Sequence, residues 1–375
     1  MTSPIESIDW IVFGDDWGRH PSTTQHLVAH LPPEDRVVWV DSLGMRAPRL
    51  RWADARRVVE RVGALLGERR SRRNSVAPPA GHPARHPALR VRPHVLPWHL
   101  VPAVVAANRA LLRRQLGAMP GAVALVANPV AALYLDVVAP RRVLYLRLDR
   151  YADVPGVDPA LVAQVEPAMI ARADRIFAPN AWVMADLPPA KAELLPQGVD
   201  LERFAAVPLE PPATRVCGYW GWLGEWLDRE LVARAAAAHP DWTFELRGPS
   251  RLPPEALALG PNVRVLPPVA HAELAAAAAH WRAAWAPLTL THHMAHASPL
   301  KLREYLAAGL PTAATPIPEA LALPAIRCVR TPDDVAGFLA AALADDAEQR
   351  RQRRRAVAGD SWASRAAVVR AAAAD

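Results

Sequence analysis

The sequence is poor in the residues that build disulfide frameworks, metal knuckles and membrane spans. It has only two cysteines, Cys217 and Cys328, among 375 residues, which excludes a disulfide-stapled fold and a cysteine-based zinc site. No uncharged apolar run reaches roughly 18 residues, so we expect no membrane-spanning helix. The first residues show no basic segment followed by a long apolar one, so we expect no secretory signal. These absences favour a protein of the cytoplasm.

Lysine is nearly absent as well. Of the 44 basic residues, only Lys191 and Lys301 are lysines, and the net charge is +7. The arginine bias most simply reflects a GC-rich genome. Arg46 to Arg73 holds ten arginines and three acids. The net charge of this segment, +7, equals that of the whole chain. We expect this segment to be a basic amphipathic helix, either attached to an anionic membrane surface or simply solvated. No nucleic-acid-binding motif accompanies it, so nucleic acid is not an expected partner.

The chain is 51% hydrophobic and 22% charged, as in globular proteins. Short apolar runs alternate with helical patterns, which predicts an α/β fold with parallel sheets. The alternation restarts after the proline-rich stretch 209–214. The sequence therefore predicts two Rossmann-like, doubly wound domains at residues 1–208 and 209–359. Because ligands bind at the carboxyl ends of parallel strands, we expect the site in the cleft between the two domains.

One stretch, residues 298–319, carries the strongest local signals. Ser298 is a helix-capping residue type and Pro299 suits the first helical position. Gly309 then predicts the helix end, and Thr312 to Thr315 predicts a short strand. The start of a helix attracts phosphate through its unpaired N–H groups and its dipole. We therefore predict that this stretch holds a nucleotide diphosphate.

Several segments resemble the family 4 glycosyltransferases, which have the glycosyltransferase-B fold of two Rossmann-like domains. The segments are SPLKLREYLAAGLPTAATPIPE, LLPQGVDLERF and GYWGWLGEWLD. DWIVFGDDWGRHPSTTQHLVAHL and LYLRLDRYADVPGVD resemble, within it, glycosyltransferases of the surface-polysaccharide and teichuronic-acid type. The likeness of SWASRAAVV to the last helix of that fold implies that residues 360–375 pack back on the first domain.

The resemblance implies a retaining, metal-independent transfer of a sugar. The donor would be a nucleotide-diphosphate sugar of the UDP or GDP type, and no further cofactor is expected. The acceptor would be a cell-surface glycan or a polyprenyl-linked lipid, met in the cytoplasm at the inner face of the membrane. Two alternatives stay open on the same fold: a non-catalytic nucleotide-sugar-binding or scaffold protein, and a nucleotide-sugar epimerase.

The resemblance also implies donor-side residues. Glu304 matches the second acid of the family's Glu-x7-Glu pair and is expected to bind the ribose, whereas His296 stands at the first acid. The family's Gly-Arg and Lys pair is missing, and Gly221 lies in its place. The positive charge for the diphosphate is then expected from Lys301 and Arg247 and from the helix start formed by Ser298, Pro299 and Leu300.

The acceptor-side residues are predicted in the first domain. Asp16 and His20 follow the first strand, and Asp149 ends a later one. One of these side chains is expected to orient or deprotonate the acceptor hydroxyl; turn-forming acids are the alternative. His292, His293 and His296 have helix-like spacing, but no cysteine or carboxylate lies nearby in the sequence, so we expect no metal site. Contact with the substrate and a place as ordinary loop histidines both stay open.

Tryptophan is the exception to a low aromatic content, with 13 residues. Trp17, Trp220, Trp222 and Trp226 follow predicted strands. They could stack on a sugar or a base, or pack in the core. The sequence leaves both readings open.

Overall fold

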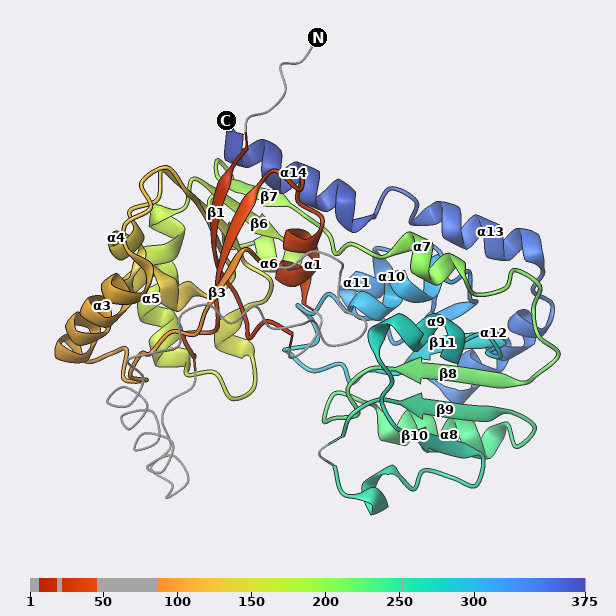
Figure 1. Ribbon diagram of the computed structural model, residues 1–375. Coiled ribbons are helices and arrows are strands. Elements are labelled where there is room, and N and C mark those ends of the chain that lie inside the picture. Colours follow the sequence, from red (N-terminus) through yellow and green to blue (C-terminus); the bar gives the residue numbers. More distant parts are fainter. Residues whose placement is uncertain (1–6, 19–21, 46–86, 251, 375) are drawn as a thin grey trace, which may run out of the picture. The chain divides into compact units, whose positions relative to one another are not determined.

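The computed structural model describes residues 7–18, 22–45, 87–250 and 252–374, which form two compact α/β units (Figure 1). Among the described residues, the first unit contains 7–18, 22–45, 87–195 and 366–374, and the second contains 196–250 and 252–365. Each unit is described by itself. None of the described helices is long and apolar enough to cross a membrane.

The first unit is built on a seven-stranded parallel sheet with the order β3-β2-β1-β4-β5-β6-β7. Its strands are β1 (Asp9–Phe13), β2 (Arg36–Val40), β3 (Leu89–Val91), β4 (Val123–Val126), β5 (Arg142–Leu146), β6 (Arg175–Ala178) and β7 (Ala192–Leu194). Most are apolar along their whole length because helices cover both faces of such a sheet. The strong apolar runs are therefore the strands that the sequence predicts best.

The helices of the first unit begin at residues that the sequence marks well. They are α1 (Thr23–Ala29), α3 (Pro102–Leu116), η1 (Pro129–Leu133), α4 (Leu135–Val138), η2 (Tyr151–Asp153), α5 (Pro159–Arg172) and α6 (Ala181–Met184). Ser22 caps α1, Asp158 caps α5 and Asn180 caps α6 by accepting backbone N–H bonds. Such caps satisfy donors that the first helical turn leaves unpaired.

The second unit is built on a six-stranded parallel sheet with the order β10-β9-β8-β11-β12-β13. Its strands are β8 (Val216–Trp220), β9 (Thr243–Arg247), β10 (Val263–Leu266), β11 (Ala283–Ala286), β12 (Thr312–Ala314) and β13 (Ile326–Cys328). The helices are α7 (Leu201–Ala205), α8 (Arg229–Ala238), η3 (Pro254–Leu257), η4 (His271–Glu273), α9 (Leu274–Ala277), α10 (Leu300–Ala307), α11 (Pro318–Leu321), α12 (Pro332–Leu343) and α13 (Ala347–Ala356). The predicted α/β class with two Rossmann-like units is confirmed.

The last helix, α14 (Trp362–Ala374), starts among residues of the second unit and continues into the first. Inside the first unit, the Arg370 guanidinium donates to both carboxylate oxygens of Asp35, at 2.9 and 3.0 Å. Arg141 donates to the carbonyl of Ala373 at 2.9 Å. The structure thus assigns residues 366–374 to the first unit, and the division lies at Leu195, ahead of the predicted linker at 209–214.

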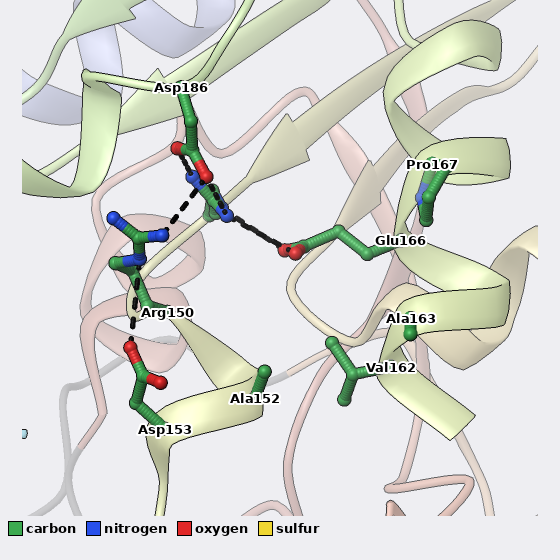
Figure 2. Close-up of a pocket in the computed structure, with 9 residues that line it drawn as sticks. Arg150, Ala152, Asp153, Val162, Ala163, Glu166, Pro167 and Asp186 are labelled. Atoms are coloured by element: carbon green, nitrogen blue, oxygen red, sulfur yellow. Dashed lines mark hydrogen bonds and ion pairs between the residues drawn. The ribbon is translucent and has the colours of Figure 1, made fainter. Parts of the chain in front are cut away.

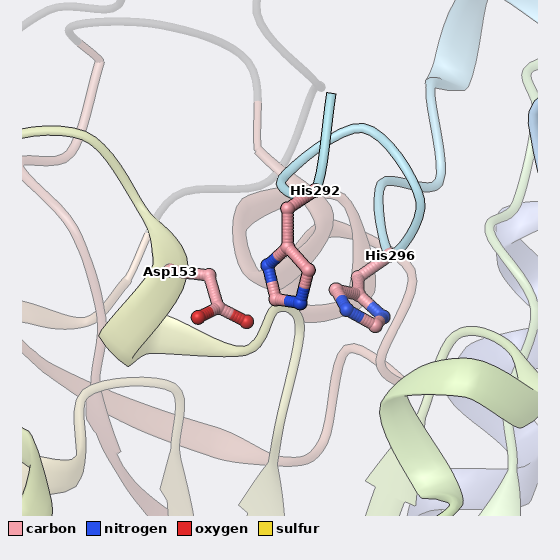
Figure 3. A group of neighbouring side chains, drawn as sticks. All are labelled: Asp153, His292 and His296. Carbon is pink, nitrogen blue, oxygen red and sulfur yellow. The ribbon is translucent and has the colours of Figure 1, made fainter. Parts of the chain in front are cut away.

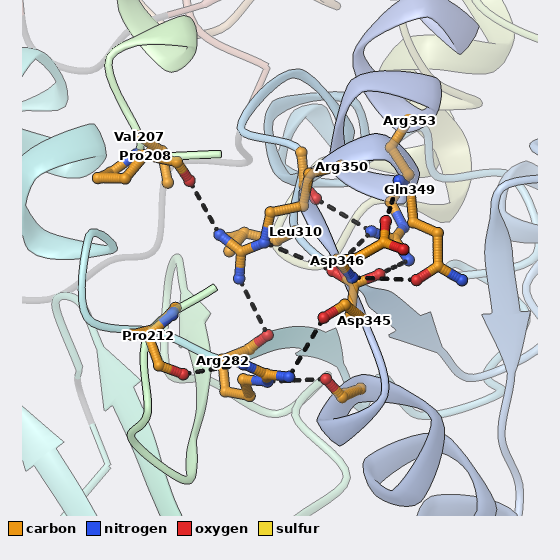
Figure 4. A network of polar contacts seen from close by, with 12 residues as sticks. Val207, Pro208, Pro212, Arg282, Leu310, Asp345, Asp346, Gln349, Arg350 and Arg353 are labelled. Carbon is orange, nitrogen blue, oxygen red and sulfur yellow. Dashed lines mark hydrogen bonds and ion pairs between the residues drawn. The ribbon is translucent and has the colours of Figure 1, made fainter. Parts of the chain in front are cut away.

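Buried arginines form a network of polar contacts in the second unit (Figure 4). Arg350 on α13 is fully buried, and its Nε lies 3.4 Å from a carboxylate oxygen of Asp345. Arg350 also donates to the carbonyl of Pro208 at 3.1 Å. Arg282, which precedes β11, donates to the carbonyls of Ala342 and Pro212 at 2.8 and 2.9 Å. The guanidinium groups thus donate hydrogen bonds to main-chain carbonyls at the ends of helices and loops, where water does not reach.

One local prediction is wrong in detail. Ser298 does not cap α10: the N-cap is Pro299, and no side chain bonds to the helix start. A proline at the N-cap shifts the first helical residue to Leu300. Glu319 lies in the short helix α11 and pairs with Arg303.

Candidate functional site

Two glycines bring the chain into close approach at the carboxyl ends of β8 and β9. Gly221 has φ +137° and Gly248 has φ +153°, a region that side chains rarely adopt. A Cβ on Gly248 would lie 1.9 Å from the carbonyl oxygen of Gly221, and one on Gly221 would lie 2.8 Å from Nζ of Lys301. The Gly221 N–H donates to the carbonyl of Arg247 at 2.9 Å. Small residues are therefore needed where the strands end, the usual ligand position of a parallel sheet.

Lys301 projects from the first turn of α10 toward this glycine. Its Nζ lies 3.3 Å from the hydroxyl of Tyr219 and 4.8 Å from the centre of that ring. The Tyr219 hydroxyl donates to the carbonyl of Trp222 at 3.1 Å. A cation–π contact and a hydrogen bond thus hold the ammonium group at the end of β8. A fixed cation next to a glycine backbone is suited to an anionic ligand.

Glu304 lies one turn further along the same face of α10, since residues three apart are neighbours on a helix. Its side chain is buried, and each of its carboxylate oxygens has a donor. The indole Nε1 of Trp220 lies 2.8 Å from Oε2, and Nε2 of His271 lies 2.7 Å from Oε1. The carboxylate is therefore held in one orientation.

Aromatic rings surround this carboxylate. The ring of Trp220 stacks on Phe204 with centroids 5.7 Å apart and on Trp281 with centroids 5.2 Å apart. The backbone N–H of Trp220 donates to the hydroxyl of Tyr305 at 3.0 Å. Burial raises the pKa of Tyr305 well above its usual range, so it remains a neutral hydroxyl. Of the two readings for Trp220, core packing is the one observed; its polar atom serves Glu304.

The other predicted donor-side residues lie around α10 and β9. Pro299 and Leu300 are the N-cap and first residue of α10. The hydroxyl of Ser298 is buried, and the described residues offer it no hydrogen-bond partner. Arg247 ends β9 and donates from Nη1 to the carbonyl of Pro267 at 3.3 Å. The structure thus joins Lys301 to Gly221 by contact and Arg247 to Gly221 through the backbone.

His296 is buried in the turn that precedes α10, and its ring lies 5.0 Å from the ring of His292 (Figure 3). The two imidazoles meet edge to face at 77°. The residue in the place of the family's first acid is therefore part of a histidine pair in a compact turn.

Two of the predicted acceptor-side acids follow strands that are not neighbours in the sheet. Asp16 follows β1 and Asp149 follows β5, and β4 lies between these strands. Asp149 accepts the N–H of Arg150 at 2.9 Å. Burial raises the pKa of Asp15, the neighbour of Asp16, and Gln25 and Ser22 donate to its carboxylate. His20 lies outside the described residues.

A small charged pocket of about 200 Å³ in the first unit was missed by the sequence reasoning (Figure 2). Arg147, directly after β5, pairs with Glu166 at 3.1 Å and with Asp186. Arg150 reaches Asp186 at 3.4 Å and Asp153 at 3.6 Å. Although burial opposes it, the hydrogen bonds that Arg147 donates to Asp186 and Glu166 raise its pKa, and Arg147 stays charged. Paired charges from distant positions give no local sequence signal.

The residues that support Glu304 were also missed. His271 follows β10, and Arg203 lies on α7, far from α10 in the sequence. In the sequence, a histidine at the start of a helical pattern indicates a surface residue. Only the folded sheet brings it within hydrogen-bond distance of Glu304.

Comparisons with known proteins agree with this architecture. Residues 228–371 match the family model described as "Glycosyl transferase-like". No curated protein matches the sequence. Among solved structures, HepE of Anabaena in complex with UDP and glucose is 11% identical, with a TM-score of 0.64 over 99% of this chain and 100% of that chain.

Two further structures are similar over nearly their whole lengths. Sucrose-phosphate synthase from Thermosynechococcus elongatus is 14% identical, with a TM-score of 0.62 over 97% of this chain and 98% of that chain. The lipopolysaccharide outer core galactosyltransferase WaaB is 12% identical, with a TM-score of 0.61 over 98% and 99% of the two chains. At these identities the structures show the fold alone. They confirm the predicted glycosyltransferase-B fold. The predicted enzyme class, a glycosyltransferase, rests on the family model matched by residues 228–371.

Proposed function

We propose that this protein transfers a sugar from a nucleotide-diphosphate donor bound at the carboxyl ends of β8 and β9. The observation that carries the proposal is the position of Lys301 beside Gly221, with Glu304 on the same face of α10. A fixed cation and a fixed carboxylate one helical turn apart match a ligand with a diphosphate at one end and vicinal hydroxyls at the other.

The proposed roles follow from the charge that develops during transfer. The diphosphate leaves with growing negative charge, while the sugar ring gains oxocarbenium character. Lys301 and the N–H groups at the start of α10 stabilise the leaving group, which takes the place of a metal ion. Glu304 accepts hydrogen bonds from the ribose. Arg247 and the Ser298 hydroxyl complete the donor side, next to His296.

The finer features remain proposals as well. UDP is the first nucleotide to test because HepE was solved with UDP and glucose, and GDP is the second. We propose a retaining, metal-independent reaction on a surface glycan or polyprenyl-linked acceptor, of the type met in surface-polysaccharide or teichuronic-acid synthesis. Asp149, Asp16 or His20 orients the acceptor hydroxyl in the first unit.

We further propose that the enzyme works in the cytoplasm at the inner face of the membrane. Residues 46–73, which lie outside the described residues, would provide the attachment through their arginines. The acceptor chemistry supports this location, because a polyprenyl chain does not leave the bilayer.

Calorimetry with a lysine pair tests the donor site. Lys301→Met should weaken binding of UDP or GDP by about ten- to hundredfold, since it removes a charge-assisted hydrogen bond. Lys191→Met is the matched control: it is the only other lysine, and its Nζ donates to the carbonyl of Ala171 at 2.9 Å in the first unit. Equal losses in both variants would refute the site.

A non-catalytic nucleotide-sugar-binding or scaffold protein is the second candidate. His296 favours it, because a buried histidine occupies the place of the family's first acid. Release of free sugar from UDP-sugars or GDP-sugars, with and without a panel of glycan acceptors, separates the two. Slow hydrolysis or transfer supports the enzyme, whereas tight binding with no turnover supports the scaffold.

A further inference from the structure

His271 has both ring nitrogens engaged by charged side chains. Its Nε2 lies 2.7 Å from Oε1 of Glu304, and its Nδ1 lies 2.5 Å from Nη1 of Arg203. The side chain of His271 is 13% exposed and that of Glu304 is 8% exposed. The rings of Phe204 and His271 meet edge to face, with centroids 5.9 Å apart. A histidine held at both ends and covered by a ring has one orientation.

The two partners also determine which nitrogen carries the proton. A guanidinium group has only donors, so the nitrogen that faces Arg203 has to be the acceptor. In the neutral imidazole the hydrogen is then on Nε2, which donates to Glu304. The opposite tautomer would place two hydrogens between His271 and Arg203 and two lone pairs between His271 and Glu304. Arg203 therefore selects the tautomer that Glu304 needs.

Arg203 is itself held in place. Its Nη2 lies 3.0 Å from Oδ2 of Asp200, the N-cap of α7, and its backbone N–H donates to Oδ1 of the same residue at 3.1 Å. A relay of polar contacts thus runs from Asp200 through Arg203 and His271 to Glu304, and Trp220 closes it on the other carboxylate oxygen at 2.8 Å. It joins α7, η4, α10 and β8 within the second unit.

We propose that His271 is a positioning residue that fixes Glu304 for the two ribose hydroxyls of the donor nucleotide, with Arg203 setting its tautomer. The inference rests on the proposed function. Nε2 of His271 and the indole of Trp220 each contact a different carboxylate oxygen of Glu304, so the carboxylate does not rotate. A carboxylate held in one orientation recognises a vicinal diol and gains nothing from a sugar without hydroxyls.

The test compares two nucleotides in calorimetry, UDP and 2′,3′-dideoxy-UDP, or the guanosine pair if wild type binds GDP. His271→Leu should lose about tenfold in affinity for the natural nucleotide, since it removes one donor to a charged acceptor. Its affinity for the dideoxy probe should stay within about twofold. His271→Gln should recover most of the loss, because its amide can donate to Glu304.

Nitrogen-15 spectra of His271 give a second readout that does not depend on a variant folding. Wild type should show a protonated Nε2 and an unprotonated Nδ1, and Arg203→Met should lose that preference. A protonated Nδ1 in wild type would overturn the inference, as would equal losses for both nucleotides in His271→Leu. Wild type that binds neither UDP nor GDP would instead remove the proposed function and the inference with it.

Discussion

Asp35 is a buried carboxylate of the first unit that accepts hydrogen bonds from three residues. It accepts hydrogen bonds from the backbone of Ile8 and the indole of Trp10, each at 3.0 Å, and from the guanidinium of Arg370. Burial by itself would raise its pKa, but the bonds from Arg370, Ile8 and Trp10 outweigh it and hold the pKa of Asp35 below its usual range. The ionised form is thus the one that the fold stabilises.

The pH dependence follows from the direction of this shift. A carboxyl with a lowered folded-state pKa contributes stability above its ordinary pKa of about 4, and that stability is lost as the pH falls below it. We expect the free energy of unfolding of wild type to fall in this acidic range. Asp35→Asn should be less stable at neutral pH and should show a shallower acid loss. Urea titrations at several pH values measure both.

A matched control is Asp346→Ala, which removes an exposed helix cap on α13 instead. It should cost about 1 kcal/mol and leave the acid slope close to that of wild type. An unchanged slope in Asp35→Asn would contradict the ion pair.

At the same scale, the sequence predicted some site residues and missed others for a physical reason. Lys301 was predicted because it is a cation at the start of a predicted helix, and Glu304 because it matches the second acid of the family's motif. His271, Arg203 and the indole of Trp220 were missed because their contacts to Glu304 arise only when β8, η4 and α10 pack together. Local spacing carries no information about such contacts.

At the scale of elements, α13 is held by a fully buried guanidinium. Arg350 lies against Asp345 and against the carbonyls of Pro208, Trp281 and Arg282 (Figure 4). Desolvation lowers the pKa of Arg350, and the charge of Asp345 opposes that effect. Arg350 helps to hold α13 in place, because removing it leaves buried main-chain carbonyls without their donor, although Asp345 keeps Arg353 at 2.6 Å.

Neighbouring arginines on α13 allow a matched test. Arg350→Met should destabilise the protein by about 3 kcal/mol. Arg351→Met should change the free energy of unfolding by less than about 0.5 kcal/mol, since Arg351 is 45% exposed and pairs with Glu348 at the surface. Chemical denaturation of the two variants measures the difference. Equal effects would show that burial of Arg350 does not matter.

The elements themselves were predictable to different degrees. Strands such as β4 and β11 are uninterrupted apolar runs, and α12 has a capping box at Thr331, so both kinds of signal lie in the chain. The short helices α4 and α6 each have four residues, too few for a periodic pattern. The start of α10 was misplaced by one residue, because Ser298 is a capping type and Pro299 suits the first helical position, whereas the structure has Pro299 as the N-cap.

At the scale of the whole molecule, the repeated strand–helix alternation was enough to predict two parallel sheets. The division between the units was harder to locate, because the proline-rich stretch 209–214 resembles a linker while the structure divides the chain at Leu195. Residues 196–208 contain α7, whose Phe204 packs in the second core. One buried aromatic residue is a weaker sequence signal than a cluster of prolines.

The charge distribution leads to the last prediction. If residues 46–73 attach the protein to a membrane, sedimentation with vesicles of anionic lipid should recover it, and recovery should fall as salt is raised. Neutral vesicles are the control, and equal recovery with both would contradict the proposal. A variant with the ten arginines of this segment replaced by glutamine should remain in the supernatant.

Because lysine is scarce in this chain, chemical labelling of amines can report on the proposed donor site. An amine-reactive reagent finds only two side-chain amines in this chain, at Lys191 and Lys301. One lies on the outside of the first unit, and the other stands beside Gly221 at the end of β8. In mass spectrometry of a labelled sample, a ligand that occupies the site should lower the modification of the peptide that contains Lys301. The peptide that contains Lys191 is the internal reference.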